Sequence, residues 1–360
     1  MKKVRSGTAK LKSSATTTER DREIAWYDVT AWGIEGKGFQ DTESYFDRLP
    51  ARAKGIVRQP VWDLSLHSAG MCADFRTDAA EIHARWTLTS ASLAMPHMPA
   101  TGVSGLDLYA WSGKGGWRWA GVGRPETTPI VKALLVENLR AAPREYRVYL
   151  PLYNGVKSVE IGVPKGAAFA GVPPRRKNPI VFYGTSIVQG GCAARPGMAH
   201  PAILGRRLDC PVINMGFSGN GIMEPEVAAL LAELDPCAYV IDCLPNMDAA
   251  AVAERAEPLV RTLWTAHPGT PIVLVEDRIH ANATFVPTRR QRSHASRAAL
   301  RKIFDRLTAG GFTALHYVPG EHLLGDDGEA TVDGSHPTDL GFVRMADALE
   351  PLLRKLCSRQ

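Results

Sequence analysis

Short apolar runs recur about every thirty residues in the second half of the chain, and no other pattern in the sequence limits the fold as strongly. The runs cover residues 179–184, 211–214, 238–243, 271–276 and 312–317. Segments with helical patterning fill the intervals, and this spacing is typical of a parallel sheet covered by helices. It predicts a three-layer α/β domain of the flavodoxin-like kind with five parallel strands. Ligands of such domains bind beyond the carboxyl ends of the strands.

The first half of the chain has a different pattern, in which apolar and polar residues alternate. The alternation is clearest in residues 82–88, 106–110, 146–152 and 159–163. A period of two indicates antiparallel strands, and the glycines between Trp111 and Trp117 predict a hairpin there. We therefore expect a β-sandwich, jelly-roll-like domain over residues 21–172.

Charge and composition complete the domain assignment. Residues 173–178, charged and rich in proline, are the predicted linker, and residues 179–360 are the α/β domain. Residues 1–20 contain six lysines and arginines against one glutamate, so they hold five of the six net positive charges. We expect this segment to be a disordered leader. The rest of the chain is almost neutral, which argues against a nucleic-acid partner.

Several other classes of protein are excluded on the same grounds. No apolar stretch approaches the length of a membrane span, and the basic leader lacks the apolar core of a secretory signal. Six cysteines without paired spacings are typical of reduced thiols, so we expect a cytoplasmic protein. Scattered histidines and the lack of a phosphate-binding glycine loop predict neither metal nor cofactor. Whether the chain forms a homo-oligomer stays open.

Three residues in two short motifs have the chemistry of a serine hydrolase. Ser186 follows the first apolar run in a tight Gly-Thr-Ser turn, which puts its hydroxyl at the rim of the predicted sheet. Near the other end of the chain, Asp333 and His336 are three positions apart. We expect Ser186 to attack an acyl carbonyl while His336 takes its proton. Asp333 would fix the imidazole tautomer and stabilise the imidazolium.

The loops after the second and third predicted strands supply further polar groups to the same rim. They carry Gly219 and Asn246. Developing charge on a carbonyl oxygen needs preorganised donors. We expect these to be the backbone N–H groups of Ser186 and Gly219 and the side-chain amide of Asn246.

Four more polar residues near this rim allow two interpretations each. Arg195, Arg278 and His280 are candidates for substrate binding. A solvated or ion-paired role is equally consistent with the sequence for Arg195. For Arg278 and His280 a surface ion-pair cluster is the favoured interpretation. Cys192 is a rival nucleophile, although no charged partner is evident and we interpret it as structural.

The order Ser186, Gly219, Asn246 and His336, with Asp333 in a D-x-x-H motif, resembles the SGNH (GDSL-type) hydrolase family over residues 178–356. Two positions depart from its motifs. Thr185 stands where the family has aspartate, and the third block reads Leu-Pro-Asn-Met rather than Gly-x-Asn-Asp. Residues 105–109 read Gly-Leu-Asp-Leu-Tyr, which is similar to the G-x-D-L-Y signature of a two-domain subgroup.

The resemblance implies a carboxylester hydrolase, often a deacetylase that acts on acetylated sugars. Small residues and backbone amides in the loops around Ser186 favour a short acyl group on a polar alcohol. The expected partner is therefore a small-molecule or carbohydrate ester. Two alternatives remain open: a thioesterase or lysophospholipase-type lipid ester hydrolase, and a non-catalytic carbohydrate-binding protein.

Overall fold

The computed structural model describes residues 7–19 and 22–357. By their contacts these residues form two compact units. The first comprises the described residues up to Arg48, Leu66–Arg176 and Arg195–Gly197, and the second comprises Leu49–Ser65, Lys177–Ala194 and the described residues from Met198 onward. The chain therefore passes between the units several times rather than crossing a single linker.

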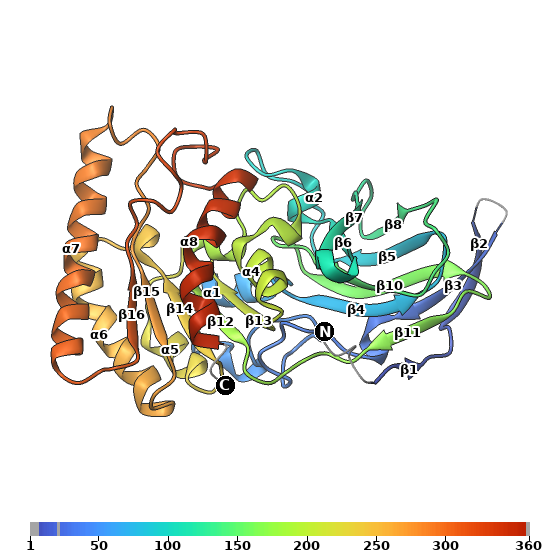
Figure 1. Ribbon diagram of the computed structural model, residues 1–360, viewed down its shortest axis with the longest axis horizontal. Helices are drawn as coiled ribbons and strands as arrows, with labels where there is room; N and C mark the ends of the chain where they lie inside the picture. The colour runs from blue at the N-terminus through green and yellow to red at the C-terminus, as the bar shows by residue number, and fades with distance from the viewer. Residues whose placement is uncertain (1–6, 20–21, 358–360) are drawn as a thin grey trace. The chain divides into compact units, whose positions relative to one another are not determined.

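The first unit contains two antiparallel sheets (Figure 1). The six-stranded sheet has, in spatial order, β1 (Ala9–Lys10), β11 (Phe169–Val172), β4 (Cys72–Thr77), β9 (Arg144–Tyr149), β6 (Leu106–Trp111) and β7 (Trp117–Gly123). The five-stranded sheet has β2 (Ala15–Glu19), β3 (Arg22–Asp28), β10 (Val156–Pro164), β5 (Ile82–Leu88) and β8 (Ile130–Val136).

One hydrophobic cluster joins the two sheets of this unit. It includes Phe75 and Val148 from the six-stranded sheet and Trp86 and Ile161 from the five-stranded sheet, all of them buried. Inward apolar residues alternate with outward polar ones along the strands, which is the pattern that the sequence shows. The predicted β-sandwich is confirmed.

The start of the chain differs from the expectation of a disordered leader. Strand β1 pairs with β11, and β2 pairs with β3 over Ala15–Glu19. Three successive threonines in β2 explain its pairing, because β-branched residues favour extended backbone and β3 offers an edge. Residues 1–6 and 20 of the predicted leader lie outside the described residues.

The second unit contains the parallel sheet. Its strands are, in spatial order, β13 (Val212–Gly216), β12 (Ile180–Gly184), β14 (Ala238–Asp242), β15 (Ile272–Val275) and β16 (Leu315–Val318). Each predicted apolar run contains one of these strands or overlaps it. The order, with the first strand between the second and the third, is that of flavodoxin-like folds. The predicted α/β fold is therefore confirmed.

Helices cover the parallel sheet in two groups. Helices α4 (His200–Leu208) and α8 (Asp339–Cys357) pack together and lie in front of the sheet in Figure 1. Helices α5 (Pro225–Leu231), α6 (Ala249–Ala266) and α7 (Pro287–Ala309) form the second group. Within the described ranges, no helix combines the length and hydropathy that a membrane span needs.

The remaining helices are short. They are α1 (Gln59–Ser65), α2 (Ala100–Val103) and α3 (Ser186–Gln189), with 3-10 turns η1 (Val29–Ala31), η2 (Ala51–Ala53), η3 (Gly113–Gly115), η4 (Pro196–Met198) and η5 (Leu244–Asn246). Turn η3 closes the predicted hairpin between β6 and β7.

Candidate active site

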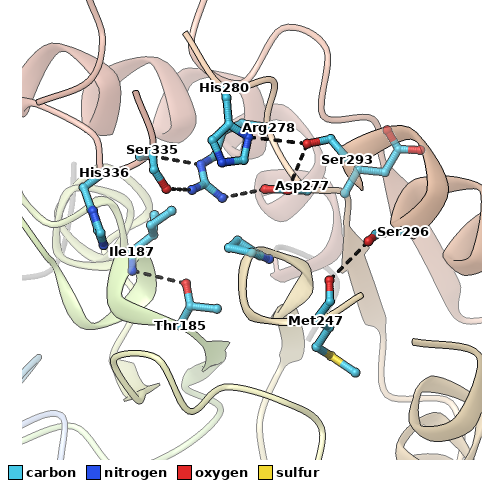
Figure 2. Close-up of polar contacts among 12 residues, drawn as sticks. Thr185, Ile187, Met247, Asp277, Arg278, His280, Ser293, Ser296, Ser335 and His336 are labelled. Atoms are coloured by element: carbon cyan, nitrogen blue, oxygen red, sulfur yellow. Dashed lines mark hydrogen bonds and ion pairs between the residues drawn. The ribbon is translucent and has the colours of Figure 1, made fainter. Parts of the chain in front are cut away.

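Ser186 is the first residue of helix α3 and follows directly after β12. Because β12 is buried between β13 and β14, its carboxyl end opens at the rim of the sheet. The Thr185 side chain caps the helix by accepting a hydrogen bond from the Ile187 N–H at 3.3 Å (Figure 2). An aspartate could accept the same bond, which explains why threonine serves at this position.

The structure brings Ser186, His336 and Asp333 into one hydrogen-bonded chain. Ser186 Oγ lies 2.9 Å from His336 Nε2, and His336 Nδ1 lies 2.7 Å from Asp333 Oδ2. The serine side is buried, while Asp333 at the outer end is exposed. This geometry allows the imidazole to accept the serine proton at one nitrogen while the other stays paired with the carboxylate.

Asp333 is held in its charged form by its own loop. Burial works to raise the pKa of this carboxyl, but hydrogen bonds from His336 and Ser335 outweigh it and lower the pKa to about 2. Its Oδ1 accepts the backbone N–H of Ser335 at 2.9 Å and that of His336 at 2.8 Å. Asp333 therefore fixes the backbone before His336 as well as the imidazole ring.

Gly219 lies on the loop after β13. It is exposed, and its φ of +69° is a left-handed conformation that glycine adopts without strain. Gln189 of helix α3 ties the loop to the serine, because its Oε1 accepts the Ser218 N–H at 3.0 Å. Within residues 7–19 and 22–357, the Gly219 N–H donates to no protein acceptor.

Asn246 ends η5, on the loop after β14. Its Oδ1 accepts the N–H of Gly221 at 3.4 Å, which orients the amide. A Cβ at Gly221 would lie 2.1 Å from the Gly184 carbonyl oxygen. The loops after β13 and β14 thus meet beside the end of β12.

Helix α7 supports the unusual third block. Ser296 Oγ donates to the Met247 carbonyl at 3.1 Å (Figure 2). Arg292 donates to the Pro245 carbonyl at 3.0 Å. These bonds hold the backbone on both sides of Asn246. The chain therefore fixes this loop without the aspartate of the family motif.

Arg195, a candidate either for substrate binding or for an ion pair, forms an ion pair with Asp107. It belongs to the first unit, where its Nη1 donates to Asp107 Oδ2 at 2.8 Å and to the Tyr109 hydroxyl at 2.6 Å. Asp107 also accepts the Gly197 N–H at 2.8 Å. Asp107 and Tyr109 are the aspartate and tyrosine of the G-x-D-L-Y signature, so that signature binds the Arg195–Gly197 segment.

Arg278 and His280, candidates for substrate binding or for an ion-pair cluster, both have buried side chains. Arg278 pairs with Asp277 and donates to Ser335, as Figure 2 shows. Burial is the main cause of a lowered pKa at His280, which therefore favours the neutral imidazole.

Sequence reasoning missed Arg58, which comes from the first half of the chain but belongs to the second unit. Its guanidinium donates to Asn220 Oδ1 at 2.9 Å and is ion-paired with Glu224, so it braces the loop after Gly219. No pattern in the sequence relates residues so far apart.

Cys192 fits its structural interpretation, since burial raises the pKa of its thiol to about 12.

Two protein-family models match the chain. The model of the GDSL-like Lipase/Acylhydrolase family matches residues 177–354, and a model for the N-terminus of Esterase_SGNH_hydro-type proteins (GxDLY) matches residues 24–169. A solved structure from Bacteroides ovatus ATCC 8483, described as a GDSL-like lipase, is 35% identical. Its alignment covers 93% of this chain and 98% of that one, with a TM-score of 0.88.

More distant structures share the fold. The salicylyl-acyltransferase SsfX3 from a tetracycline biosynthetic pathway is 18% identical over 92% of this chain and 97% of its own, with a TM-score of 0.73. A family two carbohydrate esterase from Cellvibrio japonicus is 13% identical over 93% and 98%, with a TM-score of 0.59. None of the curated proteins matches the chain.

Proposed function

This chain belongs to the GDSL-like lipase/acylhydrolase family and is a carboxylic ester hydrolase, and on that premise we propose that it removes short acyl groups, acetyl above all, from a polar or carbohydrate substrate. The observation that carries the proposal is the continuous chain of hydrogen bonds from Ser186 through His336 to Asp333. With these three side chains in contact, we set aside the non-catalytic carbohydrate-binding alternative.

The reaction proceeds in two steps. Ser186 Oγ attacks the acyl carbonyl as His336 Nε2 takes its proton, and the imidazolium then protonates the departing alcohol. Water, deprotonated by the same imidazole, attacks the acyl-enzyme, the bond between the acyl carbon and Ser186 Oγ breaks, and the imidazolium returns the proton to Oγ as the acid leaves. Asp333 keeps Nδ1 protonated and stabilises the imidazolium, a role that its lowered pKa suits.

The oxyanion of each tetrahedral intermediate is stabilised by the Ser186 and Gly219 backbone N–H groups and by the Asn246 amide. Two observations support this set. Gly219 is exposed on a loop that Gln189 ties to the serine helix. Asn246 Oδ1 accepts the Gly221 N–H, which leaves the amide nitrogen of Asn246 to donate to another acceptor. Loss of one such donor costs roughly 3–4 kcal/mol of barrier.

The preference for a short acyl group rests on the loop that follows Ser186. It contains Gly190, Gly191, Ala193 and Ala194, whose small side chains offer little apolar surface to a long chain. A carbohydrate esterase has this fold, as does an acetyl xylan esterase from Butyrivibrio proteoclasticus. These neighbours make a carbohydrate ester the first substrate class to test.

One observation favours a longer acyl group. Phe285 is 85% exposed in the segment that follows β15, and Ile279 and Val332 are exposed in the segments next to Arg278 and Asp333. Exposed aromatic and aliphatic side chains of this kind can receive an acyl chain. The lipid ester or thioester alternative therefore predicts that Phe285 contributes to substrate affinity.

The experiment is a series of acetyl, butyryl and octanoyl esters of one alcohol, assayed with wild type and Phe285→Ala. We expect the highest kcat/KM for the acetyl ester and no effect of the substitution on it. A higher kcat/KM for the octanoyl ester that is lost in Phe285→Ala would contradict the short-acyl preference and support the lipid ester alternative. Acetylated sugars assayed in parallel test the polar alcohol.

The compartment remains a proposal from the sequence. The six cysteines are thiols rather than disulfides, which suits a reducing compartment, and we propose the cytoplasm.

A further inference from the structure

A buried arginine lies behind the loop that carries His336. Arg278 follows β15, and only 3% of its side chain is exposed. One of its nitrogens, Nη1, pairs with Asp277 Oδ1 at 2.5 Å, which compensates the charge inside the protein. The other two donor nitrogens, Nε and Nη2, point away from Asp277 and toward Ser335.

Ser335 receives the other donors of this guanidinium. Arg278 Nε donates to the Ser335 carbonyl oxygen at 3.0 Å, and Nη2 donates to Ser335 Oγ at 2.5 Å (Figure 2). Ser335 directly precedes His336, and its N–H is bound by Asp333. Arg278 therefore binds both the backbone and the side chain of Ser335, the residue that directly precedes His336 and whose N–H Asp333 accepts.

Helix α7 fixes the other half of the ion pair. Ser293 Oγ donates to Asp277 Oδ2 at 3.3 Å, and Arg297 Nε donates to the Asp277 carbonyl at 2.7 Å. Ser293 also lies 3.4 Å from His280 Nδ1 (Figure 2). A chain of buried polar contacts therefore runs from α7 through Asp277 and Arg278 to the loop of His336.

We propose that Arg278 is a positioning residue for His336, which sets the imidazole at the distance and angle that proton transfer from Ser186 requires. The inference rests on the proposed function of Ser186 and His336. Displacement of a reacting group by about 1 Å can cost 10²-fold in rate. The planar guanidinium supplies two parallel donors at fixed spacing, which the single ammonium of lysine cannot reproduce.

The test measures kcat and KM for a short acyl ester with Arg278→Ala and Arg278→Lys. We expect kcat of Arg278→Ala to fall on the order of 10²-fold with KM nearly unchanged, because the substrate still binds while proton transfer is misaligned. Lysine should restore little of the loss. Added methylguanidinium, but not methylammonium, should restore part of kcat by filling the vacated site.

Arg147→Ala is the matched control, since Arg147 is a buried arginine of the other unit that donates hydrogen bonds to the carboxylates of Asp74 and Glu35. Its soluble folded fraction should keep its kcat and should not respond to methylguanidinium. A kcat of folded Arg278→Ala within twofold of wild type, or equal rescue of both variants, would overturn the proposal.

If Arg278→Ala does not fold, Ser335→Ala replaces it. That substitution removes only the Oγ acceptor and leaves the contact between Arg278 Nε and the Ser335 carbonyl. We expect a smaller fall in kcat, again without a rise in KM, and an unchanged kcat would contradict the proposal. An inactive Ser186→Ala beside a fully active Arg278→Ala would remove the positioning role alone. Full activity in both variants would remove the proposed function itself.

Discussion

Each unit of the molecule buries an arginine beside an aspartate, and the two pairs are used differently. In the β-sandwich, Arg147 on β9 faces Asp74 directly across the strand pair, with bonds of 2.7 and 2.8 Å, and reaches Glu35 at 3.1 Å. In the α/β unit, Arg278 gives one nitrogen to Asp277 and the others to Ser335. The first arginine joins parts of a core, whereas the second holds a loop.

The buried carboxylates around the two arginines show the same difference. Burial works to raise the pKa of Glu35, but Arg147 and Arg175 outweigh it, and the pKa is lowered. Asp242, at the end of β14, is buried in the other unit. Burial and the negative charge of Asp277 raise the pKa of Asp242, and together they outweigh the lowering effect of Arg278, so that the pKa is about 7.

Burial of an arginine–aspartate pair does not by itself show whether the pair serves stability or catalysis. What distinguishes the two arginines is the destination of the remaining donors. The donor nitrogens of Arg147 bind carboxylates, so loss of Arg147 should affect the stability of the fold. The remaining donor nitrogens of Arg278 bind Ser335, which precedes His336, so loss of Arg278 should affect catalysis.

The largest expected effect on stability belongs to the sandwich pair. Arg147→Ala leaves Asp74 and Glu35 as buried charges with less compensation, and we expect it to lower the free energy of unfolding by about 3–5 kcal/mol. Denaturant unfolding followed by tryptophan fluorescence measures the change. A loss below about 1 kcal/mol would mean that the pair contributes as little as a surface ion pair.

A smaller effect, of opposite sign, is expected at Asp242. Its folded-state pKa of about 7 lies above the ordinary 3.8, so its contribution to stability is fully present below pH 4 and is lost as the pH rises to about 7. Asp242→Asn should therefore match wild type near pH 4 and exceed it at pH 8, by about 4 kcal/mol at most. Unfolding free energies of wild type and Asp242→Asn, measured across this pH range, test the expected difference.

Glu35→Gln in the sandwich is the control for that experiment. The lowered pKa of Glu35 means that its carboxylate stabilises the fold above its ordinary pKa, so Glu35→Gln should be less stable than wild type at pH 8. If the two variants shifted stability in the same direction, the contrast between the carboxylates would be wrong.

The sequence alone predicted the parallel sheet and the loops that carry Ser186, Gly219, Asn246, Asp333 and His336. These predictions succeed because an apolar run marks a buried strand, and a polar residue at its carboxyl end must lie at the rim. Asp333 and His336 are also close in sequence, so one short motif contains their hydrogen bond.

The side-chain contacts of Arg195 and Arg278 could not be predicted in this way. The aspartate that binds Arg195 is 88 residues away in the chain, and Ser335 is 57 residues from Arg278. Sequence position gave the rim for Arg278 but not the direction of its side chain, which points into the protein. The pairing of β1 and β2 was missed because the charges of the leader outweighed its threonine run.

The central claim is that Ser186 is the nucleophile, and labelling with a fluorophosphonate probe tests it most directly. Reaction of the serine with the phosphorus displaces fluoride and leaves a stable adduct, which peptide mass mapping locates. We predict one adduct per chain on the peptide at Ser186, loss of esterase activity in parallel, and no labelling of Ser186→Ala. An adduct on Cys192 or another residue, or full esterase activity in the completely labelled protein, would contradict the account.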